Sequence, residues 1–143
     1  MRAISLHQPW ATACVHLING KALKGIETRH WRTDYRGPLA IHAAKRWDRD
    51  QHEFAAIEKT LGRLPARVAL GAIVGVVDLI DIRPTEELRL ITSAIERLYG
   101  NYGPGRFGWI LANPRQFEVP IAWPGRQSFF TVPDEVIRVA LGE

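Results

Sequence analysis

Residues 24–31, KGIETRHW, bring together side chains that could carry out hydrolytic chemistry. Glu27 could polarise a water molecule as a general base, and Lys24 could stabilise the charge that develops on an oxyanion or a phosphorane. If the segment is a strand, its side chains alternate, so Glu27 and Arg29 share one face and Thr28 takes the other. The same alternation places Lys24 opposite Glu27 unless the preceding turn redirects it. Lys24 and Glu27 are candidate catalytic residues on that condition; the alternative is a surface ion pair worth under about 1 kcal/mol.

Positive charge is concentrated around this segment. Between Lys21 and Arg49 there are eight basic and three acidic side chains, whereas the whole chain has a formal net charge of +4 and a sequence pI near 9.6. A local excess of this kind favours an anionic partner, with nucleic acid or a nucleotide ahead of a membrane. The alternative is that these charges are scattered over a solvated surface.

A wider set of side chains could bind an anionic ligand. Arg29 suits bidentate recognition of a phosphate, although its stem could equally cover apolar surface. Trp31 lies on the polar face of the expected strand and could stack on a base. His7 and Gln8 stand at a strand-to-helix junction, where they either bind an anion or a base edge or only fix the turn. The candidate ligand-binding residues are His7, Gln8, Arg29, Trp31, Tyr35, Arg36, Lys45, Arg46, Gln127 and Ser128.

Other reactive residue types give weaker signals. The single cysteine, Cys14, lies in an apolar helical pattern and is expected to be a buried, inert thiol. Asp78 interrupts an apolar strand and needs a partner, for which an ion pair is the commoner outcome and a catalytic role the alternative. The five histidines lack a spacing that would form a metal site, so no metal and no cofactor are expected.

The elements that must position these residues can be read from apolar periodicity and from turn residues. Asp48 can cap a helix, and the valine- and isoleucine-rich run from Gly71 is the clearest strand. We expect strands at residues 3–6, 71–82, 106–112 and 117–123 with two more within 24–45, and helices from Pro9 to Gly20, Asp48 to Gly62, Pro84 to Gly100, and after Pro133. Their irregular order predicts an α+β fold with a small curved sheet or barrel.

Length and composition predict one domain over residues 1–143, because the chain has 46% hydrophobic residues and no proline- or serine-rich linker. The longest apolar run, residues 72–77, is far too short to cross a bilayer, and the N-terminus lacks the apolar run of a signal peptide. We therefore expect a cytoplasmic protein without membrane association. The oligomeric state is left open.

Five motifs follow one another along the chain: ISLHQPWA (residues 4–11), Lys24-x-x-Glu27-x-Arg29-x-Trp31, YRGPLAIHA (35–43), GAIVGVVDLIDI (71–82), and FGWIL followed by Gly125 and Gln127. Together they resemble the ASCH domains, a family named for activating signal cointegrator homology and related to the PUA-like RNA-binding barrels. The opening HQPW is similar to the branch found in the C-terminal domain of the transcription coactivator and its bacterial relatives. The resemblance implies a PUA-like β-barrel of about five to six strands with flanking helices and a cleft beside the barrel.

The resemblance implies more than one function. The superfamily includes nucleic-acid binders, a ribonuclease branch and bacterial amidohydrolases that act on acetylated cytidine, and fold alone does not choose among them. The amidohydrolases use a lysine, a threonine three positions later and a distant glutamate. Here Lys24 matches the lysine, but Glu27 stands three positions later and Thr28 is one residue off, which argues against that mechanism.

We therefore expect a protein that binds RNA or a nucleotide-like ligand in a basic cleft, with DNA as a further candidate. That cleft would be built by Lys24, Glu27, Arg29, Trp31, Tyr35 and Lys45. The alternative is a hydrolase that acts on RNA or on a modified nucleoside such as N4-acetylcytidine. A third hypothesis is a protein-interaction module in a transcription or translation complex, with Phe129 and Phe130 as its exposed surface.

Overall fold

The run from Gly71 forms β6 (Ala72–Pro84), the strand around which the fold is built. The computed structural model describes residues 1–65 and 67–143. The other strands are β1 (Arg2–Leu6), β2 (Leu17–Ile18), β3 (Lys21–Ala22), β4 (Ile26–Arg29), β5 (Gly37–Ala43), β7 (Phe107–Ala122) and β8 (Phe130–Thr131). The helices are α1 (Trp10–Val15), α2 (Arg49–Thr60), α3 (Thr85–Leu88), α4 (Ala94–Leu98) and α5 (Asp134–Ala140).

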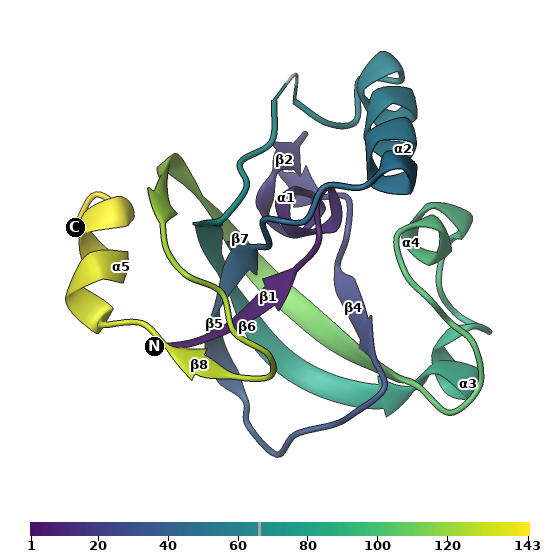
Figure 1. Ribbon diagram of the computed structural model, residues 1–143. Helices are drawn as coiled ribbons and strands as arrows, with labels where there is room; N and C mark the ends of the chain where they lie inside the picture. Colours follow the sequence, from purple (N-terminus) through teal and green to yellow (C-terminus); the bar gives the residue numbers. More distant parts are fainter. Residues whose placement is uncertain (66) are drawn as a thin grey trace.

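Six strands form one sheet in the order β4-β7-β6-β5-β1-β8, and β2 pairs with β3 in a separate hairpin. The β1–β5 pair is parallel, and every other pair in the six-stranded sheet is antiparallel. Figure 1 shows α5 beside the N-terminus at β8, whereas α2, α3 and α4 lie on the opposite side of the view. The α+β class is thus confirmed. The expected barrel is not: among the described residues the edge strands β4 and β8 do not pair, so the sheet stays open.

Both faces of the central strands are buried, which explains their almost continuous apolar sequence. One face carries Ile4, Leu39 and Val77, and it packs against α1 and Trp109. The other face carries Ala3 and Ala40 from the same strands, and it packs against α5 through Ile137. The sheet is therefore a rigid layer with a helix on each face.

The expected helix from Pro9 to Gly20 ends earlier than predicted. It stops at Val15 because His16 is already extended, with φ −74° and ψ 122°. Asn19 and Gly20 have φ values of 53° and 79°, and they form the two-residue turn between β2 and β3. Such a turn requires positive φ at both positions, which Asn-Gly adopts readily. The prediction that Asn-Gly ends the helix was therefore wrong.

The single helix expected from Pro84 to Gly100 is two short helices. Leu88 is buried at the end of α3, but Leu90 and Ile91 are 85% and 70% exposed, so the apolar stripe is not a core face. Ser93 then caps α4, because its Oγ accepts a hydrogen bond from the Glu96 N–H at 3.1 Å. Serine competes with helix continuation in this way.

The two strands expected at 106–112 and 117–123 are one strand, β7. Asn113 and Pro114 sit in a bulge, because Val76 pairs with Arg115 while Asp78 pairs with Ala112. A bulge accommodates a proline, which has no N–H for the ladder. At the same place Arg115 Nη2 lies 2.6 Å from Asp78 Oδ1, so Asp78 has the ion-pair partner that its position requires.

Cys14 is buried in the core, as expected, and burial raises the pKa of its thiol far above the ordinary value. The expected exposure of Phe130 was wrong, because that side chain is 8% exposed and packs with Val132 and Ile137. Within the described part of the chain, no helix has both the length and the hydropathy needed to cross a membrane.

Candidate functional site

Lys24 and Glu27 lie together, although simple strand alternation would separate them. Lys24 precedes β4, and its backbone N–H donates to the carbonyl of Ala13 in α1 at 3.0 Å. Its side chain is fully buried; Nζ donates to the carbonyl oxygen of Tyr99 at 2.6 Å and lies 3.3 Å from Glu27 Oε1. The turn before β4 thus brings the lysine to the same side as the glutamate.

A second cation completes a charge triad, Lys24–Glu27–Arg29. Arg29 Nε lies 3.3 Å from Glu27 Oε2, and Arg29 Nη2 donates to the carbonyl of Ser5 in β1 at 2.8 Å. The Glu27 carboxylate lies between these two cations, of which Lys24 is fully buried and Arg29 is partly buried. The Glu27 side chain is 12% exposed, so it still reaches solvent. Pairing of Glu27 with Trp109 across the β4–β7 ladder fixes its backbone.

The Glu27 carboxylate opens into a cavity of about 440 Å³, which we call the Glu27 cleft. Its walls come from the end of β1, the start of α1, β4, the end of α4 and the following loop. A cavity of this size falls in the range of small-molecule sites. The lining residues are Leu6, His7, Trp10, Glu27, Thr28, Leu98, Tyr99, Gly100, Asn101 and Arg106.

The walls of the Glu27 cleft are held in place by hydrogen bonds. Arg106 donates through Nη2 to the carbonyl of Thr28 at 3.1 Å and through Nε to the carbonyl of Asn101 at 3.0 Å. The Asn101 N–H in turn donates to Thr28 Oγ1 at 2.9 Å. On the other side, the Trp10 ring stacks on Phe54 of α2 with centroids 5.6 Å apart. The cleft therefore exists before any ligand enters.

Two buried groups near the triad shape its electrostatics. Glu96 accepts a hydrogen bond from the Gly25 N–H at 2.8 Å, and burial raises the pKa of its carboxyl, although the nearby Lys24 charge works in the opposite direction. Burial likewise raises the pKa of the Tyr102 hydroxyl, which has no hydrogen-bond partner among the described residues. The Lys24 ammonium therefore interacts electrostatically with two carboxyl groups, those of Glu96 and Glu27.

Several predicted ligand-binding residues lie away from the Glu27 cleft. The Trp31 ring contacts Trp109 and Phe129 edge-on, with centroids 4.8 and 5.4 Å away, so it packs against the core. The Tyr35 hydroxyl donates to the carbonyl of Pro38 at 2.5 Å. Arg36 donates to two backbone carbonyls of its own turn.

Gln8 and His7 are adjacent in sequence, but Gln8 is buried and His7 is exposed. Gln8 is fully buried, and its amide bonds to Thr12 and to the carbonyl of Ala69, which fixes the start of α1. His7 is exposed and lines the Glu27 cleft. Among the predicted set, the structure therefore brings His7, Lys24, Glu27 and Arg29 together.

The remaining predicted residues are exposed and lie outside the Glu27 cleft. The Lys45 stem lies beside Gly71, where an added Cβ would come within 2.8 Å of its Cγ. Arg46 Nε lies 3.6 Å from Asp48 Oδ2. Gln127 and Ser128 lie in the loop before β8.

Sequence reasoning missed the far wall of the cleft. Tyr99 lies in the expected helix from Pro84 to Gly100, Arg106 begins the expected strand 106–112, and Asn101 lies in the turn-rich segment between them; none of the three was named as a candidate. The signal that could have found them is an arginine and an asparagine in a loop rich in glycine, because such loops carry binding residues on a rigid scaffold.

Comparisons with known proteins agree with this fold. The model of the ASCH domain family matches residues 4–121. The structure of ASCH from Zymomonas mobilis is similar, with 15% identity, a TM-score of 0.56, and coverage of 94% of this chain and 88% of that chain. A tyrosine-to-phenylalanine variant of the Zymomonas mobilis protein gives a TM-score of 0.58 at 15% identity, with 99% and 96% coverage.

No curated protein sequence matches the chain. At 15% identity, the structural likeness shows the fold alone. The family match says more, because it extends from β1 into β7 and includes the charge triad and every residue that lines the Glu27 cleft. On that match, the chain belongs to the ASCH domain family.

Proposed function

We propose that this protein binds RNA, or a nucleotide-like ligand, in the Glu27 cleft. The observation that carries the proposal is a cavity of about 440 Å³ that is lined by Glu27, whose carboxylate is paired with the two cations Lys24 and Arg29. PUA-like relatives of the ASCH family are associated with RNA binding, which supports the same ligand class. DNA is the second ligand to test.

The lining residues suit a nucleotide. His7 and Asn101 are exposed polar side chains that can bond to a base edge or to a phosphate, and the half-buried Trp10 ring offers an apolar wall. The volume fits about one nucleotide rather than a long strand, so a chain of RNA would place a single residue inside. Arg106 also lines the cleft, and Arg29 pairs with Glu27 beside it.

A hydrolase is the second candidate, because Glu27 reaches the cleft while a lysine lies beside it. Glu27 would then be a general base for water, and Lys24 would stabilise the developing negative charge. The complete burial of Lys24 favours binding over this chemistry, since its ammonium already bonds to a carbonyl and a carboxylate. The Thr28 Oγ1 accepts a hydrogen bond from the Asn101 N–H, so this hydroxyl takes part in holding the wall of the cleft.

Binding is tested by fluorescence anisotropy of a labelled single-stranded RNA over a salt series. Several phosphate contacts would make the logarithm of the affinity fall linearly with the logarithm of salt. His7→Ala should weaken binding more than His30→Ala, because His30 is exposed and lies outside the Glu27 cleft. Absent or salt-independent binding would reject the proposal.

Hydrolysis is tested on a denaturing gel with end-labelled RNA, with and without chelator. Wild type and Glu27→Gln are compared with Glu118→Gln, which changes an exposed glutamate in the part of β7 that pairs with the start of β6 and not with β4. Cleavage that survives chelation and is lost only in Glu27→Gln would make the protein a metal-independent ribonuclease. Intact RNA in every lane would favour binding alone and leave modified nucleosides as the next substrates to test.

A further inference from the structure

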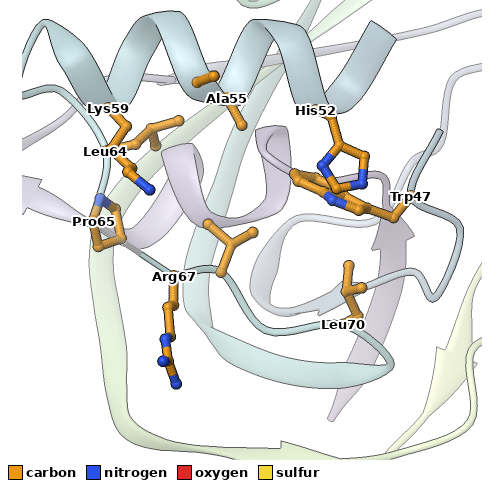
Figure 2. Close-up of a pocket in the computed structure, with 10 residues that line it drawn as sticks. Trp47, His52, Ala55, Lys59, Leu64, Pro65, Arg67 and Leu70 are labelled. Atoms are coloured by element: carbon orange, nitrogen blue, oxygen red, sulfur yellow. The ribbon is translucent and has the colours of Figure 1, made fainter. Parts of the chain in front are cut away.

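A second concavity lies between α2 and the chain that leads from it to β6, and we call it the Trp47 pocket (Figure 2). Its volume is about 370 Å³. Figure 2 shows Trp47 and His52 at one side of it and Lys59, Leu64 and Pro65 at the other. The lining residues are Trp47, His52, Ala55, Ala56, Lys59, Leu64, Pro65, Arg67, Val68 and Leu70.

The described residues that line the Trp47 pocket are apolar or basic, and none of them is acidic. Leu64, Pro65 and Val68 supply apolar wall, whereas His52, Lys59 and Arg67 can be cationic. Arg67 is exposed, and in the described part of the chain it makes no hydrogen bond or ion pair. A pocket of this composition suits a ligand that has a flat apolar part and a negative charge.

Trp47 can supply the flat surface. Its ring is half-buried and contacts the His52 ring at a centroid distance of 4.5 Å and an interplanar angle of 64°, which holds it in place. An aromatic ring that is held but partly accessible is the usual platform for an unpaired base, and stacking tolerates every base because each has a π-face.

The acidic side chains nearby do not cancel the positive charge of the pocket. Of the four acids between residues 48 and 58, three are paired with arginines: Asp48 with Arg46, Glu53 with Arg49, and Glu58 with Arg63. The fourth, Asp50, is exposed in the first turn of α2. Lys45, two residues before Trp47, is also exposed.

We propose that the Trp47 pocket binds a second nucleotide of a single-stranded RNA, with its base on Trp47 and its phosphate near Arg67. This inference rests on the proposed function. Helix α2 links the two concavities: its Phe54 stacks on Trp10, which lines the Glu27 cleft, whereas its Ala55 and Ala56 line the Trp47 pocket. One strand can therefore occupy both by passing over this helix, and the basic residues around Trp47 contact its phosphates.

The test measures the affinity of a short labelled oligouridylate by anisotropy. Trp47→Leu should weaken binding about tenfold, since stacking of one base is worth that order of affinity. Arg67→Gln should weaken binding and lower the salt dependence by about one phosphate contact. Arg89→Gln is the matched control, because it removes the same charge from an exposed arginine outside both concavities.

A second readout does not depend on the stability of Trp47→Leu. RNA should quench tryptophan emission in wild type and quench it less in Trp47→Phe, which keeps an aromatic ring but removes this indole. Uridine monophosphate in place of RNA distinguishes a free nucleotide from a nucleotide within a strand. Quenching at concentrations similar to those needed with RNA would assign the pocket to a free nucleotide, and much weaker quenching would assign it to a strand.

The outcomes separate this inference from the proposed function. Suppose that wild type binds RNA and that His7→Ala weakens this binding. If Trp47→Leu and Arg67→Gln then bind RNA as well as Arg89→Gln does, and RNA quenches Trp47→Phe as fully as wild type, the second nucleotide site is rejected and the first remains. If wild type binds neither RNA nor uridine monophosphate, both proposals fall.

Discussion

Lys24 Nζ lies 3.3 Å from Glu27 Oε1 across the start of β4, and the lysine side chain is fully buried there. Because β4 begins only at Ile26, Lys24 is free of the alternation that governs the strand. Its ammonium also donates to the carbonyl of Tyr99, which is 75 residues away in sequence. Lys24 therefore bridges Glu27 and Tyr99, which both line the Glu27 cleft.

Removing the buried cation should destabilise the protein strongly. In Lys24→Met, Glu27 loses one of its two cations and the Tyr99 carbonyl loses its donor. Removing one partner of a buried ion pair typically costs about 3–5 kcal/mol, because the other charge stays buried. Urea unfolding measures the change in the free energy of unfolding.

Lys21→Met is the control for this prediction, because Lys21 is exposed in β3. Surface substitutions usually change stability by less than about 0.5 kcal/mol. If Lys24→Met were as stable as Lys21→Met, the buried pair would have no role in holding the cleft together.

Gly75 should not tolerate a side chain. An added Cβ would collide with the carbonyl oxygen of Arg115 on β7 and would lie 2.9 Å from Val15 Cγ1 of α1. Since the first obstacle is backbone, the neighbouring strand must shift, and overpacking of this kind costs about 1–3 kcal/mol. Thermal unfolding of Gly75→Ala should show the loss.

Gly25→Ala is the matched glycine control. The nearest atom to its added Cβ is Glu96 Oε1 at 3.8 Å, which is an ordinary contact. We expect little change in its melting temperature. Equal losses in the two variants would show that the close approach of α1 and β7 at Gly75 does not limit packing.

His42 should make the protein less stable in mild acid. Its Nε2 lies 2.7 Å from the carbonyl of Trp123, which can only accept, so Nδ1 accepts the hydroxyl proton of Ser5 in the neutral ring. Burial lowers the pKa of His42, although the bond to Trp123 works in the opposite direction. The unfolded chain therefore binds the proton first as the pH falls.

The sign of this pH effect follows from that order of protonation. The stability that neutral His42 contributes is fully present above the ordinary histidine pKa near 6.5. This contribution is lost as the pH falls from there through the lowered pKa of His42. Glu96 acts oppositely, because its raised pKa makes its contribution fade as the pH rises. Urea unfolding of wild type and His42→Gln between about pH 7 and pH 5 isolates His42, since Glu96 is common to both. A difference that does not change with pH would refute the assignment.

Local signals predicted the parts of the fold that local chemistry determines. Asp48 caps α2 through the Gln51 N–H, and the side chain of Gln51 returns a bond to the Asp48 N–H, so the start of this helix could be read directly. The valine- and isoleucine-rich run of β6 was equally clear. Asn19-Gly20 carried a correct turn signal, but the sequence did not distinguish the end of a helix from a hairpin.

The candidate site depended on contacts that no local pattern contains. Lys24 is held by its hydrogen bonds to the carbonyls of Ala13 and Tyr99. The Trp31 ring packs against the core through its contacts with Trp109 and Phe129. Strand alternation predicted a polar face for Trp31, but β4 ends at Arg29, so the alternation does not extend to Trp31. Basic residues close in sequence therefore have different surroundings: Lys24 and Arg29 pair with Glu27, whereas Lys45 lies outside the Glu27 cleft.

Arg106 gives a prediction about the cleft that separates shape from charge. Its guanidinium donates to the carbonyls of Thr28 and Asn101 and so joins two walls of the Glu27 cleft. Arg106→Lys keeps the charge but loses the planar fork that makes both bonds. We expect RNA affinity to fall about fivefold, as for one hydrogen bond, while the slope of affinity against salt stays unchanged. Arg126→Lys, in the exposed loop before β8, is the control. A changed slope with Arg106→Lys would mean that Arg106 contacts phosphate directly, and unchanged affinity would mean that the wall it holds does not contact the ligand.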